Sequence, residues 1–309
     1  SGLLKITKYN IFLKKYLHIA SDVVCLHLQY ASEITILNLK QIKMSKNILV
    51  TGASSGFGLL IANELHRKGF NVIGTSRNPE KYASKLPFKM IALDLDSEQS
   101  INTFSERIFK EISQLDILIN NAGFLVSGIA EETPIDLGRQ QLETNFWGTI
   151  KVTNAVLPHF RKQKSGKIIT VGSITGLVAF PNTSYYAASK HALEGYFKAL
   201  RYELNEFNIS VAMIEPGSFK TNIMSNSTTT LNRIEDYNTL RNKSEKYAEL
   251  IVREGEDPAM VAAKVLKVVE TDKPSFRNLV GKGLPVLITL QHFAYGMLEK
   301  TILKQLNKS

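Results

Sequence analysis

The chain has 309 residues, 44% of them hydrophobic and 21% charged, which is the composition of a folded globular protein able to bury its own core. The single cysteine, Cys25, excludes an internal disulfide framework and a cysteine-based zinc site. The six histidines lack metal-ligand spacing, and no run reaches the ~20 apolar residues of a membrane span, so we expect neither a metal site nor a transmembrane segment.

The net charge of +10 is concentrated at the two ends of the chain. Residues 1–43 and residues 271–309 each carry +4, which leaves +2 for the body between them. A nucleic-acid-binding protein usually gathers its basic residues with aromatic residues on one element, so we expect no nucleic-acid partner. Two alternatives stay open for the basic ends: solvated tails, or contact with an anionic membrane surface or an acidic partner.

Residues 1–43 differ in pattern from the rest of the chain. They mix lysines with apolar residues, and Asp22 breaks the apolar stretch that a cleavable signal would need. Met44 precedes the apolar run Ile48–Val50, where the regular pattern begins. We therefore expect a single domain over 44–309, with 1–43 as an extension of uncertain status, in a cytoplasmic protein.

From residue 46 onward, short apolar runs alternate with stretches long enough for a helix. The segment from Phe57 to Lys68, for example, carries Leu60, Ile61 and Leu65 at helical spacing. Repeated strand–helix units predict an α/β fold with one doubly wound parallel sheet and helices on both faces. The apolar runs are Asn47–Val50, Asn71–Gly74, Met90–Leu93, Asp116–Ile119, Lys167–Val171, Ile209–Ile214 and Asn278–Val280.

Two segments near the carboxyl end stand apart from this alternation. The polar stretch 222–257 is long for a loop, and we expect a substrate lid over about 218–257. The run after Leu284 has apolar residues at helical spacing, which predicts a helix over about 284–305. The pattern leaves open whether that helix is a lid, part of the core or a membrane contact.

The segment Thr51–Gly58 directly follows the first predicted strand and opens the first predicted helix. Gly52 permits a sharp turn, Gly56 allows the backbone to approach a pyrophosphate closely, and Gly58 allows the helix to pack tightly on the sheet. The free N–H groups at the start of a helix favour an anion. This combination of strand, glycine loop and helix predicts a site for a phosphate-bearing cofactor.

Six motifs follow one another in an order that identifies a family. They are Thr51–Gly58 (TGxxxGxG), Asp94-Leu95, Asn120–Gly123 (NNAG), Asn145, Ser173 with Tyr186 and Lys190 (Ser…YxxxK), and Pro216-Gly217 with Thr221. In these motifs the sequence resembles the short-chain dehydrogenase/reductase family, strongly over about 46–222 and weakly beyond. The resemblance implies a Rossmann-type domain and an NAD(P)-dependent oxidoreductase acting on a CH–OH group. We also expect a homodimer or homotetramer.

The chemistry of hydride transfer explains the catalytic residue types. A carbonyl that accepts a hydride needs a proton donor for its oxygen. Tyr186 can supply the proton, and Lys190 lies four residues on, on the same helix face, where its charge would lower the phenol pKa. The adjacent Tyr185 is rotated away from Lys190, so packing or substrate contact is expected of it. Ser173 can hydrogen-bond the substrate oxygen.

The resemblance also assigns the cofactor contacts. It implies that Lys190 holds the nicotinamide ribose, that Asn145 orders a water relaying protons to Lys190, and that Tyr186 also contacts the cofactor. The remaining cofactor-binding residues implied are Gly52, Ser54, Ser55, Gly56, Phe57, Gly58, Arg77, Asp94, Asn120, Pro216, Gly217, Phe219 and Thr221. NAD-preferring relatives carry an acidic residue at the end of the second strand, whereas Ser76 and Arg77 stand here. We therefore expect NADP(H), with NAD(H) as the alternative.

The substrate is the least determined part of the prediction. Ser173–Leu193 resembles the branch with 17β-hydroxysteroid and retinol dehydrogenase-like enzymes, which implies a hydrophobic alcohol or ketone of steroid, retinoid or lipid type. The alternatives are a 3-oxoacyl-thioester reductase and, in another class, a catalytically silent NADP-sensing regulator. The residues expected to wall the pocket are Phe124, Leu125, Val126, Ile174, Leu177, Val178, Phe180, Ile223 and Met224.

Overall fold

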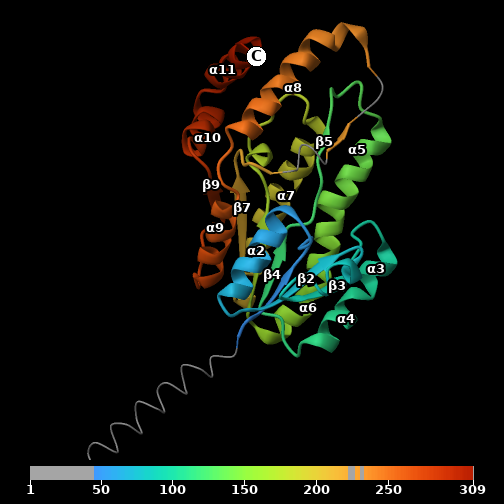
Figure 1. Cartoon of the computed structure of the whole chain (residues 1–309). Coiled ribbons are helices and arrows are strands. Elements are labelled where there is room, and N and C mark those ends of the chain that lie inside the picture. The colour runs from blue at the N-terminus through green and yellow to red at the C-terminus, as the bar shows by residue number, and fades with distance from the viewer. Residues whose placement is uncertain (1–44, 222–226, 230–232, 309) are drawn as a thin grey trace, which may run out of the picture. The chain divides into compact units, whose positions relative to one another are not determined.

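Seven parallel strands form the central sheet of the computed structural model, in the order β3-β2-β1-β4-β6-β7-β9 (Figure 1). The structure describes residues 45–221, 227–229 and 233–308. The registers run in step across the sheet, so that Ile48 pairs with Val72 on one side and with Ile117 on the other. The strands are β1 (Asn47–Val50), β2 (Asn71–Ser76), β3 (Lys89–Ala92), β4 (Ile117–Asn120), β6 (Gly166–Val171), β7 (Ile209–Pro216) and β9 (Arg277–Val280).

Helices cover both faces of this sheet. They are α2 (Gly56–Arg67), α3 (Glu98–Asn102), α4 (Phe104–Glu111), α5 (Ile135–Leu142), the π-helical turn η2 (Glu143–Gly148), α6 (Thr149–Gln163), α7 (Ser184–Glu203) and α9 (Ala259–Glu270), with short 3-10 turns η1 (Pro79–Lys81), η3 (Ile174–Gly176) and η4 (Asn205–Phe207). Apolar residues of α2 and α9 pack on one face, and those of α3, α4, α6 and α7 pack on the other.

The strands are apolar along their whole length because they are buried on both sides. In β1, Ile48 and Val50 face the cluster with α2 and α9, and Leu49 between them faces the cluster with α6 and α7. This alternation is the two-residue period of a strand, and both of its faces are covered here. The predicted α/β fold with one doubly wound parallel sheet is confirmed.

A buried lysine fastens α9 to the sheet. Lys167, near the start of β6, is 6% exposed, and its Nζ donates hydrogen bonds to the carbonyl oxygens of Val268, Val269 and Thr271 at 2.6–2.9 Å. These carbonyls lie at the carboxyl end of α9, where the helix has no backbone partners left for them and where positive charge is favoured. Lys167 therefore caps the carboxyl end of α9 and joins it to β6, about a hundred residues earlier in the chain.

The segment 218–257, predicted as a lid, contains regular structure in its described part. It includes β8 (Thr228–Thr229), which pairs with β5 (Val126–Ser127), the 3-10 turn η5 (Glu235–Tyr237) and the helix α8 (Asn238–Arg253). A buried ion pair joins Arg241 of α8 to Glu132, which also accepts a hydrogen bond from Ile234 N at 2.7 Å. These contacts attach α8 to the segment after β5. Its role as a lid stays a prediction.

The carboxyl-terminal helix predicted over about 284–305 is two helices in the structure. α10 (Leu284–Phe293) ends at Ala294, whose backbone leaves the helical region, and α11 (Tyr295–Lys308) follows directly. Gly296 interrupts the apolar run two residues after the break, but the helical periodicity continues across it and predicted one helix. Within the described residues, no helix is long and apolar enough to cross a bilayer.

Candidate active site

The glycine loop after β1 has the backbone that its sequence predicts. Gly52 and Gly56 have φ of +66° and +54°, a region that L side chains rarely adopt. A Cβ on Gly58 would lie 2.2 Å from the Gly52 carbonyl oxygen and 2.4 Å from the Asn121 Nδ2. Thr51 Oγ1 accepts hydrogen bonds from Asn121 N and Ala122 N, which joins this loop to the loop after β4.

The residues around this loop fit a nicotinamide nucleotide. A Cβ placed on Gly56 would meet no atom within 4 Å, and the side chain of the N-cap residue Ser55 makes no hydrogen bond to the start of α2, which leaves backbone N–H groups there for a phosphate. Gly52 N donates to Thr75 Oγ1, which places the end of β2 beside the loop. There the buried Ser76 Oγ has no hydrogen-bond partner among the described residues, and Arg77 is exposed.

Substitutions at two glycines separate close packing from helix propensity. We expect Gly58→Ala to destabilise the fold by about 1–3 kcal/mol, because the new Cβ would overlap backbone, and to weaken nucleotide binding by shifting the loop. Gly195, on α7, has open space around a built Cβ, so Gly195→Ala should stabilise the protein by about 1 kcal/mol. Thermal melts with and without NADPH measure both effects. A Gly58→Ala protein that melts like the parent would contradict the close-packing argument.

Tyr186 and Lys190 lie on the buried face of α7. They are 9% and 6% exposed, and the Lys190 Nζ is 5.6 Å from the centre of the Tyr186 ring. Ser173 follows β6 and caps η3, and the hydroxyls of Ser173 and Thr175 lie close enough to the Tyr186 hydroxyl to act on its pKa. Thr175 Oγ1 donates to Ser173 Oγ at 2.7 Å. The structure therefore brings the predicted Ser–Tyr–Lys set together and adds Thr175, which the motif did not reveal.

The protonation of this set differs from the sequence expectation. Burial raises the pKa of the Tyr186 phenol to about 12, although its hydrogen bonds with Ser173 and Thr175 act to lower it. Burial also lowers the pKa of the Lys190 ammonium to about 8. The lysine was expected to lower the tyrosine pKa, but the desolvation of the phenol is the larger effect here. Tyr186 is therefore a protonated donor at neutral pH.

Asn145 is held in the π-helical turn η2, a distortion that is frequent at functional sites. Its Nδ2 donates to the Phe124 carbonyl oxygen at 2.9 Å and to Ser189 Oγ at 3.2 Å, and its Oδ1 accepts from Phe124 N. Ser189 Oγ in turn donates to the Tyr186 carbonyl oxygen. Ser189 therefore links Asn145 to α7, and the one sequence signal for this residue was its position three residues after Tyr186.

Several predicted cofactor residues have structural partners. Asn120 is 3% exposed, and its Nδ2 donates to Thr153 Oγ1 and Thr170 Oγ1, so its amide joins β4, α6 and β6. Phe219 is 5% exposed and packs edge-to-face on Phe57 at 5.7 Å between ring centres. Both side chains are therefore buried in packing contacts that hold the elements around the site together. Of the other expected contacts, Pro216 is the last residue of β7, and Asp94, Gly217 and Thr221 lie in the segments that follow β3 and β7.

The expected substrate wall is only partly described by the structure. Leu125, Val126, Ile174 and Val178 are buried. Leu177 instead lines a hollow of about 450 Å³ on the outer side of α7, together with residues of α10. The Tyr185 ring packs directly on Gly138, since a Cβ built on Gly138 would lie 2.3 Å from the ring. Phe124 and Phe180 are half-buried, and Ile223 and Met224 lie outside the described residues.

Two carboxylates, Glu194 one turn after Lys190 on α7 and Glu215 on β7, share one arginine. Glu215, at the end of β7, is 1% exposed, and both of its carboxylate oxygens lie 3.2–3.3 Å from Arg277 Nε. Arg277 also pairs with Glu194, which follows Lys190 by four residues on α7. Burial, then hydrogen bonding and repulsion from Glu194, raise the pKa of Glu215 to about 8, with Arg277 opposing the shift. One proton is therefore held in this cluster at neutral pH.

This cluster predicts a pH-dependent stability. Between pH 4.5 and about 8 the folded protein keeps a proton on Glu215 that the unfolded chain releases. The free energy of unfolding therefore falls as the pH rises through this range. We expect Glu215→Gln to melt progressively higher relative to the parent from pH 5 to pH 8. Glu206→Gln, at an exposed position, is the control. A Tm difference for Glu215→Gln that does not change with pH would refute the proton assignment.

Known proteins match the chain over most of its length. The model of the short chain dehydrogenase family matches residues 46–232. The chain belongs to the short-chain dehydrogenase family. It is 40% identical over 283 residues to the uncharacterized oxidoreductase YusZ of Bacillus subtilis, covering 85% of this chain and 99% of that protein.

Two further similarities concern this family. The chain is 38% identical over 242 residues to the 3-ketodihydrosphingosine reductase of Bacteroides thetaiotaomicron, covering 78% of this chain and 89% of that enzyme. A solved short-chain dehydrogenase from Streptomyces avermitilis has a TM-score of 0.73 at 30% identity, covering 86% of this chain and 98% of that one. As a family member the protein is an oxidoreductase with a nicotinamide-nucleotide domain. The roles of its individual site residues stay predictions.

Proposed function

We propose that this short-chain dehydrogenase transfers a hydride between NADP(H) and a hydrophobic alcohol or ketone. The observation that carries the proposal is the Ser173–Tyr186–Lys190 set, in which Tyr186 and Lys190 are buried and the hydroxyl of Ser173 lies beside the protonated phenol. Arg77, exposed beside the glycine loop and next to the buried Ser76 Oγ, supports NADP(H) over NAD(H).

Each residue of the set has a task that its surroundings suit. The bound nucleotide supplies the hydride. Ser173 and Tyr186 hydrogen-bond the carbonyl oxygen of the substrate, and Tyr186 gives that oxygen its proton as negative charge develops there. Lys190, whose pKa is about 8, releases and regains a proton near neutral pH and restores the phenol. Asn145 and Ser189 hold α7 beside the loop after β4.

The substrate class rests on the apolar residues and on one relative. The buried Leu125, Val126 and Val178 lie on segments next to the catalytic set, where they favour an apolar substrate. The similarity to a 3-ketodihydrosphingosine reductase favours, among apolar carbonyls, a ketone on a long alkyl chain. We therefore place a long-chain lipid ketone ahead of a steroid or a retinoid.

The experiment is NADPH oxidation with a panel of carbonyl compounds. The panel contains long-chain 3-ketones that include 3-ketodihydrosphingosine, a steroid ketone, a retinal and a 3-oxoacyl thioester. We expect the highest kcat/KM for a long-chain ketone. A clear preference for the thioester would support the 3-oxoacyl reductase alternative, and binding of NADPH without turnover of any compound would support the silent regulator.

A further inference from the structure

The two carboxyl-terminal helices expose an unusual amount of apolar surface. Of the nine large apolar side chains exposed in the described part of the chain, five lie between residues 286 and 303, and Phe293 is 87% exposed. The five are Val286, Phe293, Tyr295, Met297 and Leu303. The other four are scattered over α5, η2, α7 and α9. Apolar patches gathered in this way usually mark a surface that something covers.

Helix α10 is the clearest part of this surface. Its ten residues include no Asp, Glu, Lys or Arg, and Leu284 is the one buried residue along it. A helix this rich in apolar residues and free of charged ones is normally largely covered by a core or by lipid. α10 lies at the edge of the fold beside β9 and α11 (Figure 1), where Leu287, Ile288 and Leu290 are half-buried while Val286 and Phe293 are exposed.

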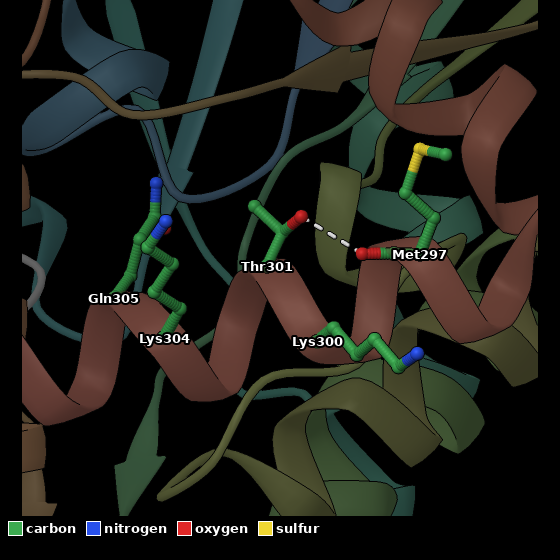
Figure 2. Close-up of a pocket in the computed structure, with 5 residues that line it drawn as sticks. All are labelled: Met297, Lys300, Thr301, Lys304 and Gln305. Atoms are coloured by element: carbon green, nitrogen blue, oxygen red, sulfur yellow. Dashed lines mark hydrogen bonds between the residues drawn. The ribbon is translucent and has the colours of Figure 1, made fainter.

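Basic residues surround the apolar ones. Lys282, Lys300 and Lys304 are all exposed, and residues 282–309 carry a net charge of +3, with Glu299 as their one acidic residue. Figure 2 shows one face of α11, where a hollow of about 520 Å³ is lined by Met297, Lys300, Thr301, Lys304 and Gln305. Lysine stems and a methionine side chain therefore share this face, which suits a surface with both phosphates and alkyl chains.

The rest of α11 is attached to the protein. Leu298 and Leu306 are buried, Lys243 Nζ donates to Asn307 Oδ1, and Tyr247 OH donates to Gln305 Oε1. These last two contacts join α11 to α8. The exposed side of α11 is thus held in place by a packed side, as in a helix that lies on a membrane and does not cross it.

We propose that α10 and α11 dock on an anionic lipid surface. Phe293, Val286 and Met297 would enter the boundary between headgroups and acyl chains, and Lys300 and Lys304 would lie near lipid phosphates. A second copy of the chain fits less well, because a two-fold contact through this face would bring the lysines of both copies together. This inference does not rest on the substrate proposed above.

Vesicle flotation of the full chain tests the docking. We expect weak binding to phosphatidylcholine vesicles and stronger, salt-sensitive binding when about one third of the lipid is phosphatidylglycerol. The double variant Lys300→Glu/Lys304→Glu should bind anionic vesicles at least about 25-fold more weakly, since each basic residue is worth roughly fivefold. Phe293→Ser/Met297→Ser should also lose binding. Residues 1–43 are the same in every variant, so the differences report on α10 and α11.

Matched controls lie elsewhere on the surface. Tyr202→Ser removes an equally exposed apolar side chain, and Lys110→Glu/Lys162→Glu reverses two exposed lysines, so both should bind like the parent. All variants should turn over a water-soluble ketone normally, which separates this proposal from the catalytic one. Equal binding of the α11 variants and the parent would overturn it, and so would loss of dimers on Phe293→Ser/Met297→Ser substitution in light scattering.

Discussion

Replacing Tyr186 by Phe is expected to lower kcat by at least ~10²-fold, the usual scale for the loss of a general acid. The ring is buried and its packing is kept, so the protein should fold and still bind NADPH. The hydroxyl that is lost is the one beside the hydroxyls of Ser173 and Thr175. Steady-state kinetics with a confirmed ketone, together with a fluorescence titration of NADPH, measure the two quantities separately.

The neighbouring tyrosine provides the matched control. Tyr185→Phe also loses one phenol hydroxyl from α7, but this ring packs against Gly138 and away from Lys190, so its kcat should stay near that of the parent. Lys190→Ala should lose both turnover and NADPH affinity. If Tyr186→Phe and Tyr185→Phe had similar kcat values, the assignment of Tyr186 as the acid would be wrong.

Replacing Arg77 by Ala is expected to raise the Kd for NADPH by roughly 10–150-fold, the cost of one charge-assisted hydrogen bond. The Kd for NADH should barely change, because NADH lacks the 2′-phosphate that Arg77 would meet. The glycine loop carries Ser54 and Ser55 and no second basic residue, so most of the discrimination falls on Arg77. Titrations of both nucleotides against parent and variant give the four constants.

An arginine outside the nucleotide site controls for the loss of charge. Arg67, at the carboxyl end of α2, is exposed and paired with Glu64, so Arg67→Ala should leave both constants unchanged. Ser76→Ala should have a smaller effect than Arg77→Ala in the same direction, since it removes one neutral donor. Equal Kd values for NADPH and NADH in the parent protein would refute the proposed cofactor preference.

The sheet could be predicted because burial on both faces leaves a strong sequence signal. All seven apolar runs became strands, with ends shifted by at most two residues. Weaker signals failed for physical reasons. β5 and β8 have two residues each and no periodicity, and the helical periodicity continues across the break at Ala294. Local patterns report local backbone preference, and these features depend on tertiary contacts.

The site was predictable as a set of residues and less so as an environment. Motif order named Ser173, Tyr186 and Lys190, and the structure brings them together. The sequence did not predict that desolvation would raise the pKa of Tyr186, because burial of a side chain is a property of the whole fold. Nor did it show the pairing of Arg277 with Glu194 and Glu215, which lie 83 and 62 residues away along the chain.

The strand order also determines how the sheet can grow during synthesis on the ribosome. Starting from β1, the strands β2 and β3 add successively on one side, and then β4, β6, β7 and β9 add successively on the other. Each strand that leaves the ribosome therefore meets a partner that has already been made, and no gap waits for a later segment. The sheet can assemble in the direction of translation, with α7, which carries Tyr186 and Lys190, arriving between β6 and β7 and the carboxyl-terminal helices last.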